Sequence, residues 1–380
     1  MVTTLTADRL AQLQDSEESF LLVDTRPADN YDAWHVPGAQ NFTFGPEEKL
    51  NGRLEEFREF AGDADRIITI CAKGISSVTL AEQLEGELEA TIEAVEGGMK
   101  AWSGVYEPVE IDIGTERATV VQIQRRAKGC LGYIIGCEAT GQAVVVDATD
   151  DPEAYATAAA DAGFTIAGVI DTHVHADHIS GGRQLAAEFD VPYYLSARAA
   201  GRDLAFEYTP LERNEVLEVG EFEIKALSTP GHTSEMISLL LEDRALVTAD
   251  TLHVDSTGRT ELEFGDDGGE KGARMLYESL HRTVLTEPEG VVVLPGHVSV
   301  SADGEFGHGQ PGEPITTTIR AARTGIEALS LEEEAFIDRL AAAGDKPANY
   351  EEILEINRGV RDADPDQRVE LELGPNNCSA

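Results

Sequence analysis

The N-terminal part of the chain alternates short apolar runs with stretches of helical periodicity. FLLVD at 20–24 and RIITI at 66–70 have the length and apolar character of buried strands. After the second run, Leu80, Leu84 and Leu88 recur at the spacing of one helix face. Strand, tight loop and helix in this order predict a parallel α/β sheet, in which functional sites gather at the carboxyl ends of the strands.

The pattern changes from about residue 119 onward. Short strand-like runs now recur with helical stretches between some of them, which predicts two sheets with helices outside. These runs are TVVQIQ, GYIIG, AVVVD, AGVID, FEIKAL, ALVTAD and VVVLP. We therefore expect an α/β protein divided into a unit at 1–108, a linker at 109–118, a second unit at 119–312, and a helical C-terminal segment with a tail at 313–380.

The net charge of the chain is strongly negative, at −42, with 71 acidic residues against 29 basic ones. The acids are spread along the chain, which indicates a solvated acidic surface rather than an acidic tail. Such a surface suits molar salt, where the Debye length falls to about 3 Å, so we expect a halophilic protein. Nucleic acids and anionic membranes both require basic patches and are not expected as partners. No long apolar span or signal peptide is recognised, so the cytoplasm is the expected location.

Cys71 opens the loop CAKGISS, which joins a strand to a helix. Backbone N–H groups and the helix N-terminus favour an anion there, so the pKa of the thiol is expected to fall. Lys73 adds positive charge, and Gly74 lets the loop curl without Cβ clashes. Ile75 and Ser76 belong to the same cradle. The loop therefore suits a cysteine that holds a sulfur atom as a persulfide anion; a buried structural cysteine is the alternative.

The sequence around this loop resembles the rhodanese family. LLVDTRPADNYDAWHVPGAQNF at 21–42 matches the DxR and H-[IV]-PGA motifs of that family, and EGGMKAW at 96–102 matches its closing motif. The resemblance implies a sulfurtransferase of the thiosulfate type, with Cys71 as the sulfur carrier. Many members have arginine directly after the cysteine, whereas this chain has Ala72, which puts the preference for thiosulfate in question.

A second cluster of chemistry-bearing residues lies in DTHVHADHISGG at 171–182, directly after the strand-like run AGVID. Imidazoles two positions apart in an extended loop can converge on one ion, and the adjoining aspartate and histidine can serve a second. The residues of this motif that could bind metal are His173, His175, Asp177 and His178. Further candidates follow other strand-like runs, so all could meet on one face; they are His232, Asp250 and His297.

The remaining histidines and cysteines lie outside these motifs. The histidines are expected to be ordinary surface or core residues; they are His35, His253, His281 and His308. Cys130 and Cys137 flank the strand-like run LGYIIG and are expected to be small core residues. Cys378, near the end of the chain, is expected to be a plain tail residue, with an exposed reactive thiol as the alternative.

The histidine and aspartate motifs resemble those of the metallo-β-lactamase superfamily over roughly 119–310. TPGHTSE, ADTLHVDSTGRTEL, LYESLHRTVL and VLPGH are shared by glyoxalase II-like thioester hydrolases and by persulfide dioxygenases. The helical stretch LSLEEEAFIDRLAAAGDKPANYEEILEINRG resembles the short C-terminal segment of the dioxygenases. A rhodanese unit on the same chain favours the same family, because such fusions occur among the dioxygenases.

The resemblance implies two alternative metal centres. A persulfide dioxygenase holds one Fe(II) in a 2-His-1-carboxylate triad, here His173, His232 and Asp250. The groups that would then support the iron rather than bind it are His175, Asp177, His178 and His297. A hydrolase of the glyoxalase II type uses zinc, with two ions about 3.5–4 Å apart. Its ligands would be His173, His175 and His232 for one zinc, Asp177, His178 and His297 for the other, and Asp250 as the bridge.

We favour the first centre: oxidation of the outer sulfur of a low-molecular-weight thiol persulfide to sulfite by O₂, with one Fe(II) per chain. Sulfur transfer through Cys71, with thiosulfate or sulfite as partner, would be coupled to it. Arg259 is a candidate for binding a substrate carboxylate, with a structural ion pair as the alternative. The other hypotheses are a thioester hydrolase with one or two zinc ions and a non-catalytic sulfur carrier or sensor. Related enzymes often form dimers, so a homodimer is one expected assembly.

Overall fold

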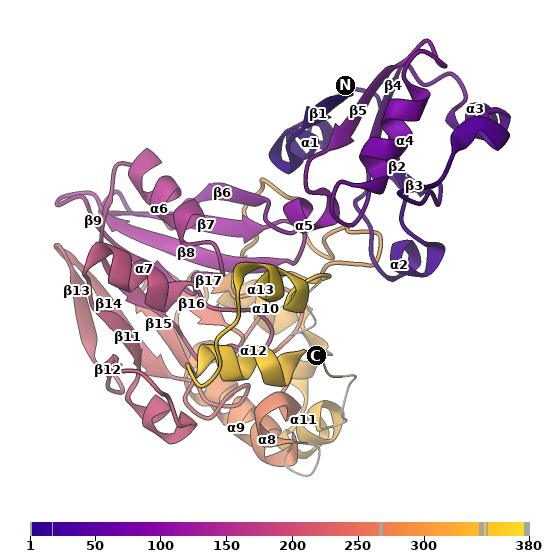
Figure 1. Ribbon diagram of the computed structural model, residues 1–380. Helices are drawn as coiled ribbons and strands as arrows, with labels where there is room; N and C mark the ends of the chain where they lie inside the picture. Colours follow the sequence, from indigo (N-terminus) through magenta and orange to yellow (C-terminus); the bar gives the residue numbers. More distant parts are fainter. Residues whose placement is uncertain (1, 17, 266–268, 342–345, 347–348, 376–380) are drawn as a thin grey trace.

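A five-stranded parallel sheet forms the first unit of the chain (Figure 1). The computed structural model describes residues 2–16, 18–265, 269–341, 346 and 349–375. The strands of the first sheet, in hydrogen-bonded order, are β1 (Thr3–Leu5), β5 (Thr91–Val95), β4 (Arg66–Ile70), β2 (Leu21–Asp24) and β3 (Ala39–Asn41). Its helices are α1 (Ala7–Gln14), α2 (Ala28–Ala33), α3 (Leu54–Ala61), α4 (Ser76–Leu84) and α5 (Gly98–Trp102). The expected parallel α/β unit is confirmed.

The central strand β4 shows why this sheet forms. Ile67, Ile68 and Ile70 are fully buried, and helices cover the sheet, so β-branched residues fill both of its faces. Leu80 and Leu84 of α4 pack into the same core, as their helical spacing predicts. This packing fixes the carboxyl end of β4, where the Cys71 loop begins.

Two further sheets pack face to face in the second unit (Figure 1). The seven-stranded sheet has the order β12 (Thr209–Leu211), β11 (Tyr193–Ser196), β10 (Thr165–Ile170), β9 (Gln142–Val146), β8 (Cys130–Cys137), β7 (Ala118–Arg125) and β6 (Tyr106–Ile111). The six-stranded sheet has the order β13 (Val216–Val219), β14 (Phe222–Ser228), β15 (Ile237–Leu241), β16 (Ala245–Ala249), β17 (Val292–Pro295) and β18 (Thr317–Thr318). Their facing apolar side chains form one core, so the expected sandwich is confirmed.

Helices cover the outer faces of this sandwich. Those between the strands are α6 (Pro152–Asp161), α7 (Gly182–Phe189), α8 (Glu261–Phe264) and α9 (Gly269–Arg282). Those of the C-terminal segment are α10 (Ile319–Gly325), α11 (Glu333–Leu340), α12 (Tyr350–Asn357) and α13 (Pro365–Leu371). Ile353 and Ile356 of α12 pack on Ile179, directly after the HxHxDH motif. The C-terminal helices therefore reach the loop that carries the metal candidates. None of the described helices is long and apolar enough to cross a membrane.

The expected linker at 109–118 differs from the structure. Its first residues belong to β6, which pairs antiparallel with β7 from Tyr106 opposite Arg125 to Ile111 opposite Val120. The buried side chains of Val109 and Ile111 alternate with exposed Glu110, a period of two that is typical of an edge strand. The strand therefore starts the second unit earlier than the sequence reading placed it.

The two units are docked against each other near the end of β7. Arg126, whose side chain is largely buried, forms an ion pair with Asp15 of the first unit at 2.6 Å. Ala127 packs into the core of the first unit. On the other side, the His35 N–H donates a hydrogen bond to the carbonyl of Ala302 at 3.0 Å. The junction is thus built from apolar packing, buried charge and backbone hydrogen bonds.

Candidate functional site

The thiol of Cys71 lies in a small cradle at the carboxyl end of β4. The Gly74 N–H donates a hydrogen bond to Sγ at 3.1 Å, and the Ser77 hydroxyl donates another at 3.2 Å. Gly74 has a φ of +80°, which a residue with a side chain rarely adopts. Burial by itself would raise the pKa of the Cys71 thiol, but hydrogen bonds from Ser77, Ser76 and Lys73 outweigh burial and lower it. The cradle therefore stabilises a sulfur anion.

The other predicted members of the loop play different parts. The Lys73 ammonium pairs with Glu370 of α13 at 2.8 Å, with both side chains about half exposed. Ile75 is 62% exposed and contributes an apolar surface beside the thiol. The Ser76 hydroxyl lies 2.9 Å from that of Thr25.

The EGGMKAW motif packs against the Cys71 loop and is hydrogen-bonded to its backbone. The Met99 N–H donates to the Cys71 carbonyl at 2.8 Å, and the Lys100 N–H donates to the Ala72 carbonyl at 3.2 Å. Gly98 packs so closely that an added Cβ would lie 2.0 Å from the Cys71 oxygen. The glycine is required because any side chain would push the loop away from α5.

Removing the Ser77 hydroxyl tests the cradle. Ser77→Ala should raise the pKa of Cys71, because the variant loses a donor to the thiolate, and slow alkylation by iodoacetamide at pH 7 about tenfold. The measurement is the rate of alkylation against pH, whose midpoint should move to higher pH. Thr79→Ala is the matched control, since that hydroxyl donates to the Ile75 carbonyl. An unchanged midpoint in Ser77→Ala would contradict the assignment.

Three of the predicted metal ligands meet at the carboxyl ends of strands in the second unit. His173, His232 and Asp250 follow β10, β14 and β16, and all three are buried. Nε2 of His173 lies 3.9 Å from Asp250 Oδ2, and Nε2 of His232 lies 3.5 Å from it. These distances are too long for hydrogen bonds. They fit ligands that share one ion at about 2.1 Å each, which lie roughly 3–4 Å apart.

The two histidines of this triad have their Nδ1 atoms beside polar groups of the protein, which leaves their Nε2 atoms for the metal. His232 Nδ1 lies 2.7 Å from the Arg259 carbonyl, and His173 Nδ1 lies 3.0 Å from the Thr172 hydroxyl, so each Nε2 is left for a ligand bond. His173 Nε2 and Asp250 Oδ2 are buried and have no hydrogen-bond partner among the described residues. Buried polar atoms without partners are costly, and a bound cation would satisfy them. The donor set therefore fits a metal ion.

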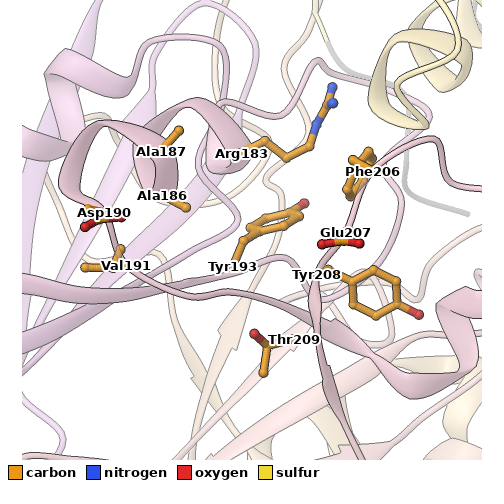
Figure 2. A pocket seen from close by; sticks show the side chains of 10 residues that line it. All are labelled: Arg183, Ala186, Ala187, Asp190, Val191, Tyr193, Phe206, Glu207, Tyr208 and Thr209. Carbon is orange, nitrogen blue, oxygen red and sulfur yellow. The ribbon is translucent and has the colours of Figure 1, made fainter.

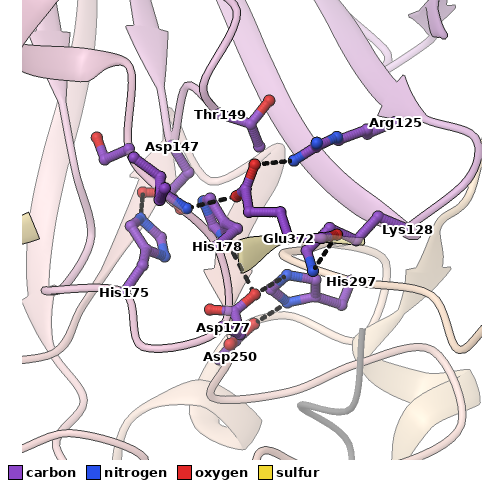
Figure 3. A network of polar contacts seen from close by, with 12 residues as sticks. Arg125, Lys128, Asp147, Thr149, His175, Asp177, His178, Asp250, His297 and Glu372 are labelled. Atoms are coloured by element: carbon purple, nitrogen blue, oxygen red, sulfur yellow. Dashed lines mark hydrogen bonds and ion pairs between the residues drawn. The ribbon is translucent and has the colours of Figure 1, made fainter. Parts of the chain in front are cut away.

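His297 lies between two carboxylates rather than in the triad (Figure 3). Its Nδ1 lies 2.6 Å from Asp250 Oδ1, and its Nε2 lies 2.9 Å from Asp177 Oδ2. His178 Nδ1 lies 2.9 Å from the same oxygen of Asp177. Burial disfavours the charged imidazole, but Asp250 and Asp177 outweigh it and hold the pKa of His297 well above its usual value. His297 Nδ1 is therefore hydrogen-bonded to Asp250, whereas Nε2 makes a charge contact with Asp177 but has no hydrogen-bond partner among the described residues.

His175 points toward a third carboxylate. Its Nε2 lies 3.3 Å from Asp147 Oδ1, and its ring lies 4.1 Å from that of His173. Asp147 accepts hydrogen bonds from the Thr172 N–H at 2.7 Å and from the Thr172 hydroxyl at 2.9 Å. Neither ring nitrogen of His175 has a hydrogen-bond partner among the described residues, so the ring remains a candidate metal ligand.

Two residues that the sequence reading assigned to the core or surface belong to this centre. Cys130 is buried, as expected of a small core residue, and its Sγ also lies among the ligand atoms of Asp177, His178 and His297. His253 is also buried, with Nε2 3.3 Å from Asp250 Oδ1.

The signals for these two residues differ in kind. For His253 the signal was its position three residues after Asp250. For Cys130 the sequence holds none, because an isolated backbone bridge with His297, far away in the chain, brings the residue to the site. Cys137 does lie in the sandwich core, and Cys378 lies outside the described residues.

Arg259 is buried and forms an ion pair with Glu261, with Nε 2.8 Å from Oε1. This is the structural pairing that the sequence left open as the alternative. Its carbonyl also orients His232, as described above. Binding of a substrate carboxylate by Arg259 stays a prediction.

A surface pocket of about 540 Å³ is lined by residues of α7 and of the stretch 206–209 (Figure 2). Arg183, Tyr193 and Phe206 are among its lining residues. The Tyr193 hydroxyl donates to Asp171 Oδ2 at 2.7 Å, and the Arg183 guanidinium lies over the Phe206 ring at 4.4 Å. Tyr193 in the pocket wall thus holds Asp171, the first residue of the loop 171–182 that carries the candidate metal ligands (the metal loop).

Comparisons with known proteins match two families along the chain. A rhodanese-like domain matches residues 6–104, and the metallo-beta-lactamase superfamily matches residues 126–297. The bovine (Bos taurus) mitochondrial persulfide dioxygenase ETHE1 is 26% identical over 43% of this chain and 62% of its own length. A hydroxyacylglutathione hydrolase of Polaromonas sp. is 32% identical over 43% of this chain and 60% of its own length. The chain thus spans about three fifths of each of these two relatives.

One relative and one solved structure are covered more fully. The crystal structure of ETHE1 from Myxococcus xanthus superposes with a TM-score of 0.53 at 28% identity, over 63% of this chain and 97% of that one. The probable metallo-hydrolase YqgX of Bacillus subtilis is 31% identical over 36% of this chain and 70% of its own length. With so much of a relative covered at this identity, and with the same superfamily matched at 126–297, the chain belongs to the metallo-beta-lactamase superfamily and carries a rhodanese-like domain before it.

Proposed function

We propose that the chain is a persulfide dioxygenase. Its metal centre would oxidise the outer sulfur of a low-molecular-weight thiol persulfide to sulfite, and its rhodanese-like domain would carry sulfane sulfur on Cys71. The observation that carries the proposal is the spacing of the triad's ligand atoms. Nε2 of His173, Nε2 of His232 and Oδ2 of Asp250 are spaced for one shared ion, and His297 Nδ1 lies against the other oxygen of Asp250. One Fe(II) in this triad is the proposed content.

The chain's own residues have distinct roles in this proposal. His173, His232 and Asp250 hold one Fe(II) as a 2-His-1-carboxylate triad. When bound, the iron supplies open positions for the substrate sulfur and for O₂. His297 orients Asp250 through its 2.6 Å contact. The reaction balances: one persulfide, one O₂ and one water give one thiol and one sulfite, with release of protons.

The Cys71 loop performs the transfer step. The Cys71 thiolate attacks the outer sulfur of thiosulfate, the S–S bond of the donor breaks, and sulfite leaves with the electron pair. The Gly74 N–H and the Ser77 hydroxyl, which now face Sγ, stabilise the charge on the cysteine persulfide. A small thiol then takes the outer sulfur and restores the Cys71 thiolate. The product is the substrate that the metal centre oxidises, so the two domains act on one sulfur atom in turn.

A dinuclear zinc thioester hydrolase is the second candidate, and a specific observation favours it. Cys130, Asp177, His178 and His297 bring their ligand atoms within 4.8 Å of one another. Four such donors could hold a zinc ion beside the triad. The hydrolase relative from Polaromonas also has higher identity to this chain, at 32%, than the bovine dioxygenase, at 26%.

Oxygen uptake decides between the two candidates. Iron-loaded protein in molar KCl, a condition that also suits the proposed halophilic surface, should consume O₂ with glutathione persulfide and release sulfite. The control reaction is hydrolysis of lactoylglutathione by zinc-loaded protein with O₂ removed. Metal analysis should give one iron per chain. Hydrolysis without O₂, together with two zincs per chain and no uptake, would instead establish the thioester hydrolase.

A further inference from the structure

A continuous buried run of hydrogen bonds begins at the Cys71 loop. The Met99 N–H donates to the Cys71 carbonyl at 2.8 Å, and the short helix α5 continues from Met99 to Ser103. The close approach of Gly98 to the Cys71 oxygen leaves no room between the loop and the helix. A shift of the Cys71 backbone must therefore move α5, because close-packed groups transmit displacement.

Arg125 continues the run across the domain junction. Its Nε donates to the Ser103 carbonyl at 2.8 Å, and its Nη1 donates to Glu372 Oε2 at 2.9 Å. The side chains of Arg125 and Glu372 are only 4% and 1% exposed. Solvent and salt screen so buried a pair little.

Glu372 completes the run at the metal loop (Figure 3). Its Oε1 accepts a hydrogen bond at 2.6 Å from the N–H of Ile179, the residue directly after His178. The Asn357 amide holds the same loop from α12, donating to the carbonyls of His175 at 2.8 Å and His178 at 2.7 Å. The metal loop is thus fixed by two C-terminal side chains, and one of them bonds to Arg125.

A parallel set of contacts exists at the surface but is weaker. Glu370 of α13 pairs with Lys73 at 2.8 Å and with Lys100 at 3.1 Å. Glu370 and Lys73 are about half exposed, and such pairs contribute little. The buried run is therefore the stronger connection between the two sites.

We propose that Arg125 and Glu372 are positioning residues that couple the sulfur-loaded state of Cys71 to ligand binding at the metal centre. The proposal rests on the sulfur-carrier role of Cys71. Loading adds one sulfur atom to Sγ inside the cradle, so the backbone of the Cys71 loop must shift. Because this loop is in close contact with α5, the helix must shift with it. Through Ser103, Arg125 and Glu372 the adjustment reaches the Ile179 N–H beside His178. By linkage, a ligand on the metal must then affect the loading of Cys71 equally.

The test measures metal-site binding in the two states of Cys71. Full-length protein carrying Co(II) is loaded with thiosulfate, freed of sulfite by desalting, and titrated with azide, which occupies an open metal position without accepting sulfur. Loading is checked separately by the mass increase of one sulfur atom and by thiocyanate release with cyanide. The Kd for azide should differ at least about fivefold between loaded and unloaded protein. Cys71→Ser protein, treated in the same way, should show no difference.

Arg126 provides the matched control at the same junction. It is as buried as Arg125 but pairs with Asp15 and Glu107 instead of Glu372. Arg125→Met should abolish the difference in azide affinity, whereas Arg126→Met should retain it. If Arg125→Met does not fold, the double variant Arg125→Met with Glu372→Met fills the same space without a buried charge and should also lack the difference.

The outcomes separate the coupling from the proposed function. A loaded Cys71 with unchanged azide affinity overturns the coupling and leaves the carrier role intact. Loss of the difference in Arg126→Met as well as in Arg125→Met also overturns it, because general docking of the domains would then be the cause. Protein that takes up no sulfur overturns the carrier role and the coupling together. Absence of O₂ uptake in loaded iron protein would count against the dioxygenase alone.

Discussion

Replacing Asp250 by alanine should abolish oxygen uptake and weaken Fe(II) binding by more than about 100-fold, beyond the loss typical of a residue that only orients a ligand. Asp250 is fully buried, and its Oδ2 faces Nε2 of both His173 and His232. Its Oδ1 also holds Nδ1 of His297 at 2.6 Å. The substitution would therefore remove a proposed metal ligand and release His297 from its contact with that carboxylate. The measurements are iron content after dialysis and the rate of O₂ consumption with glutathione persulfide.

A nearby exposed carboxylate gives the control for this variant. Asp255→Ala, five positions along the chain, should keep both iron and oxygen uptake, because its Oδ1 contacts only the Ser256 hydroxyl among the described residues. The variant His297→Ala distinguishes the proposed mononuclear iron centre from the alternative dinuclear zinc centre. With one iron in the triad it should retain most of the metal, whereas a second zinc would be lost with it. Retention of iron and activity by Asp250→Ala would show that the triad is misassigned.

Replacing Glu372 by alanine should lower the free energy of unfolding by about 3–5 kcal/mol. The variant leaves the Arg125 guanidinium buried without its carboxylate and removes the acceptor of the Ile179 N–H. Glu370→Ala, which breaks half-exposed pairs two positions away in the chain, should lower the free energy of unfolding much less, because solvent screens such pairs. The measurement is urea unfolding followed by circular dichroism. Equal midpoints for the two variants would contradict the importance of the buried pair.

The same pair predicts how stability depends on pH. Burial opposes ionisation of Glu372, but Arg125 and Lys128 outweigh it and hold the pKa of the carboxyl below its usual value of 4.5. A carboxyl with a depressed pKa in the folded state contributes stability above its unfolded value. The contribution should be present above about pH 4.5 and should disappear as the pH falls through the folded pKa. Unfolding of Glu372→Ala should accordingly lack this part of the acid dependence.

The sequence predicted most of the fold because the fold depends on local pattern, whereas the choice of His173, His232 and Asp250 as the triad came from the family resemblance and stays a prediction. Runs such as RIITI identify strands by their β-branched residues, and parallel strands bring their carboxyl ends to one edge. His173, His232 and Asp250 each follow a strand, so their convergence could be expected. The prediction missed β6, although the alternation of Val109, Glu110 and Ile111 is that of an edge strand.

The rest depends on contacts between distant parts of the chain. Arg125 and Glu372 are 247 positions apart, and the sequence around either residue does not indicate that the two form an ion pair. Cys130 lies beside the candidate ligands, where its backbone pairs with that of His297. Such meetings follow from sheet order and from the return of the C-terminal helices, which no local periodicity specifies. The chemistry of the centre was therefore more predictable than its supporting residues.

The cations at the domain junction have a consequence for how the protein responds to salt. In a chain with only 29 basic residues, Arg125, Arg126 and Lys128 are all at least 94% buried within four consecutive positions. Screening acts on charges that face solvent and hardly on charges that are enclosed. Concentrated salt should relieve the mutual repulsion of the acidic exterior while leaving the attraction at the junction almost unchanged. The two domains can therefore keep one fixed orientation across a range of salinity in which the surface electrostatics change greatly.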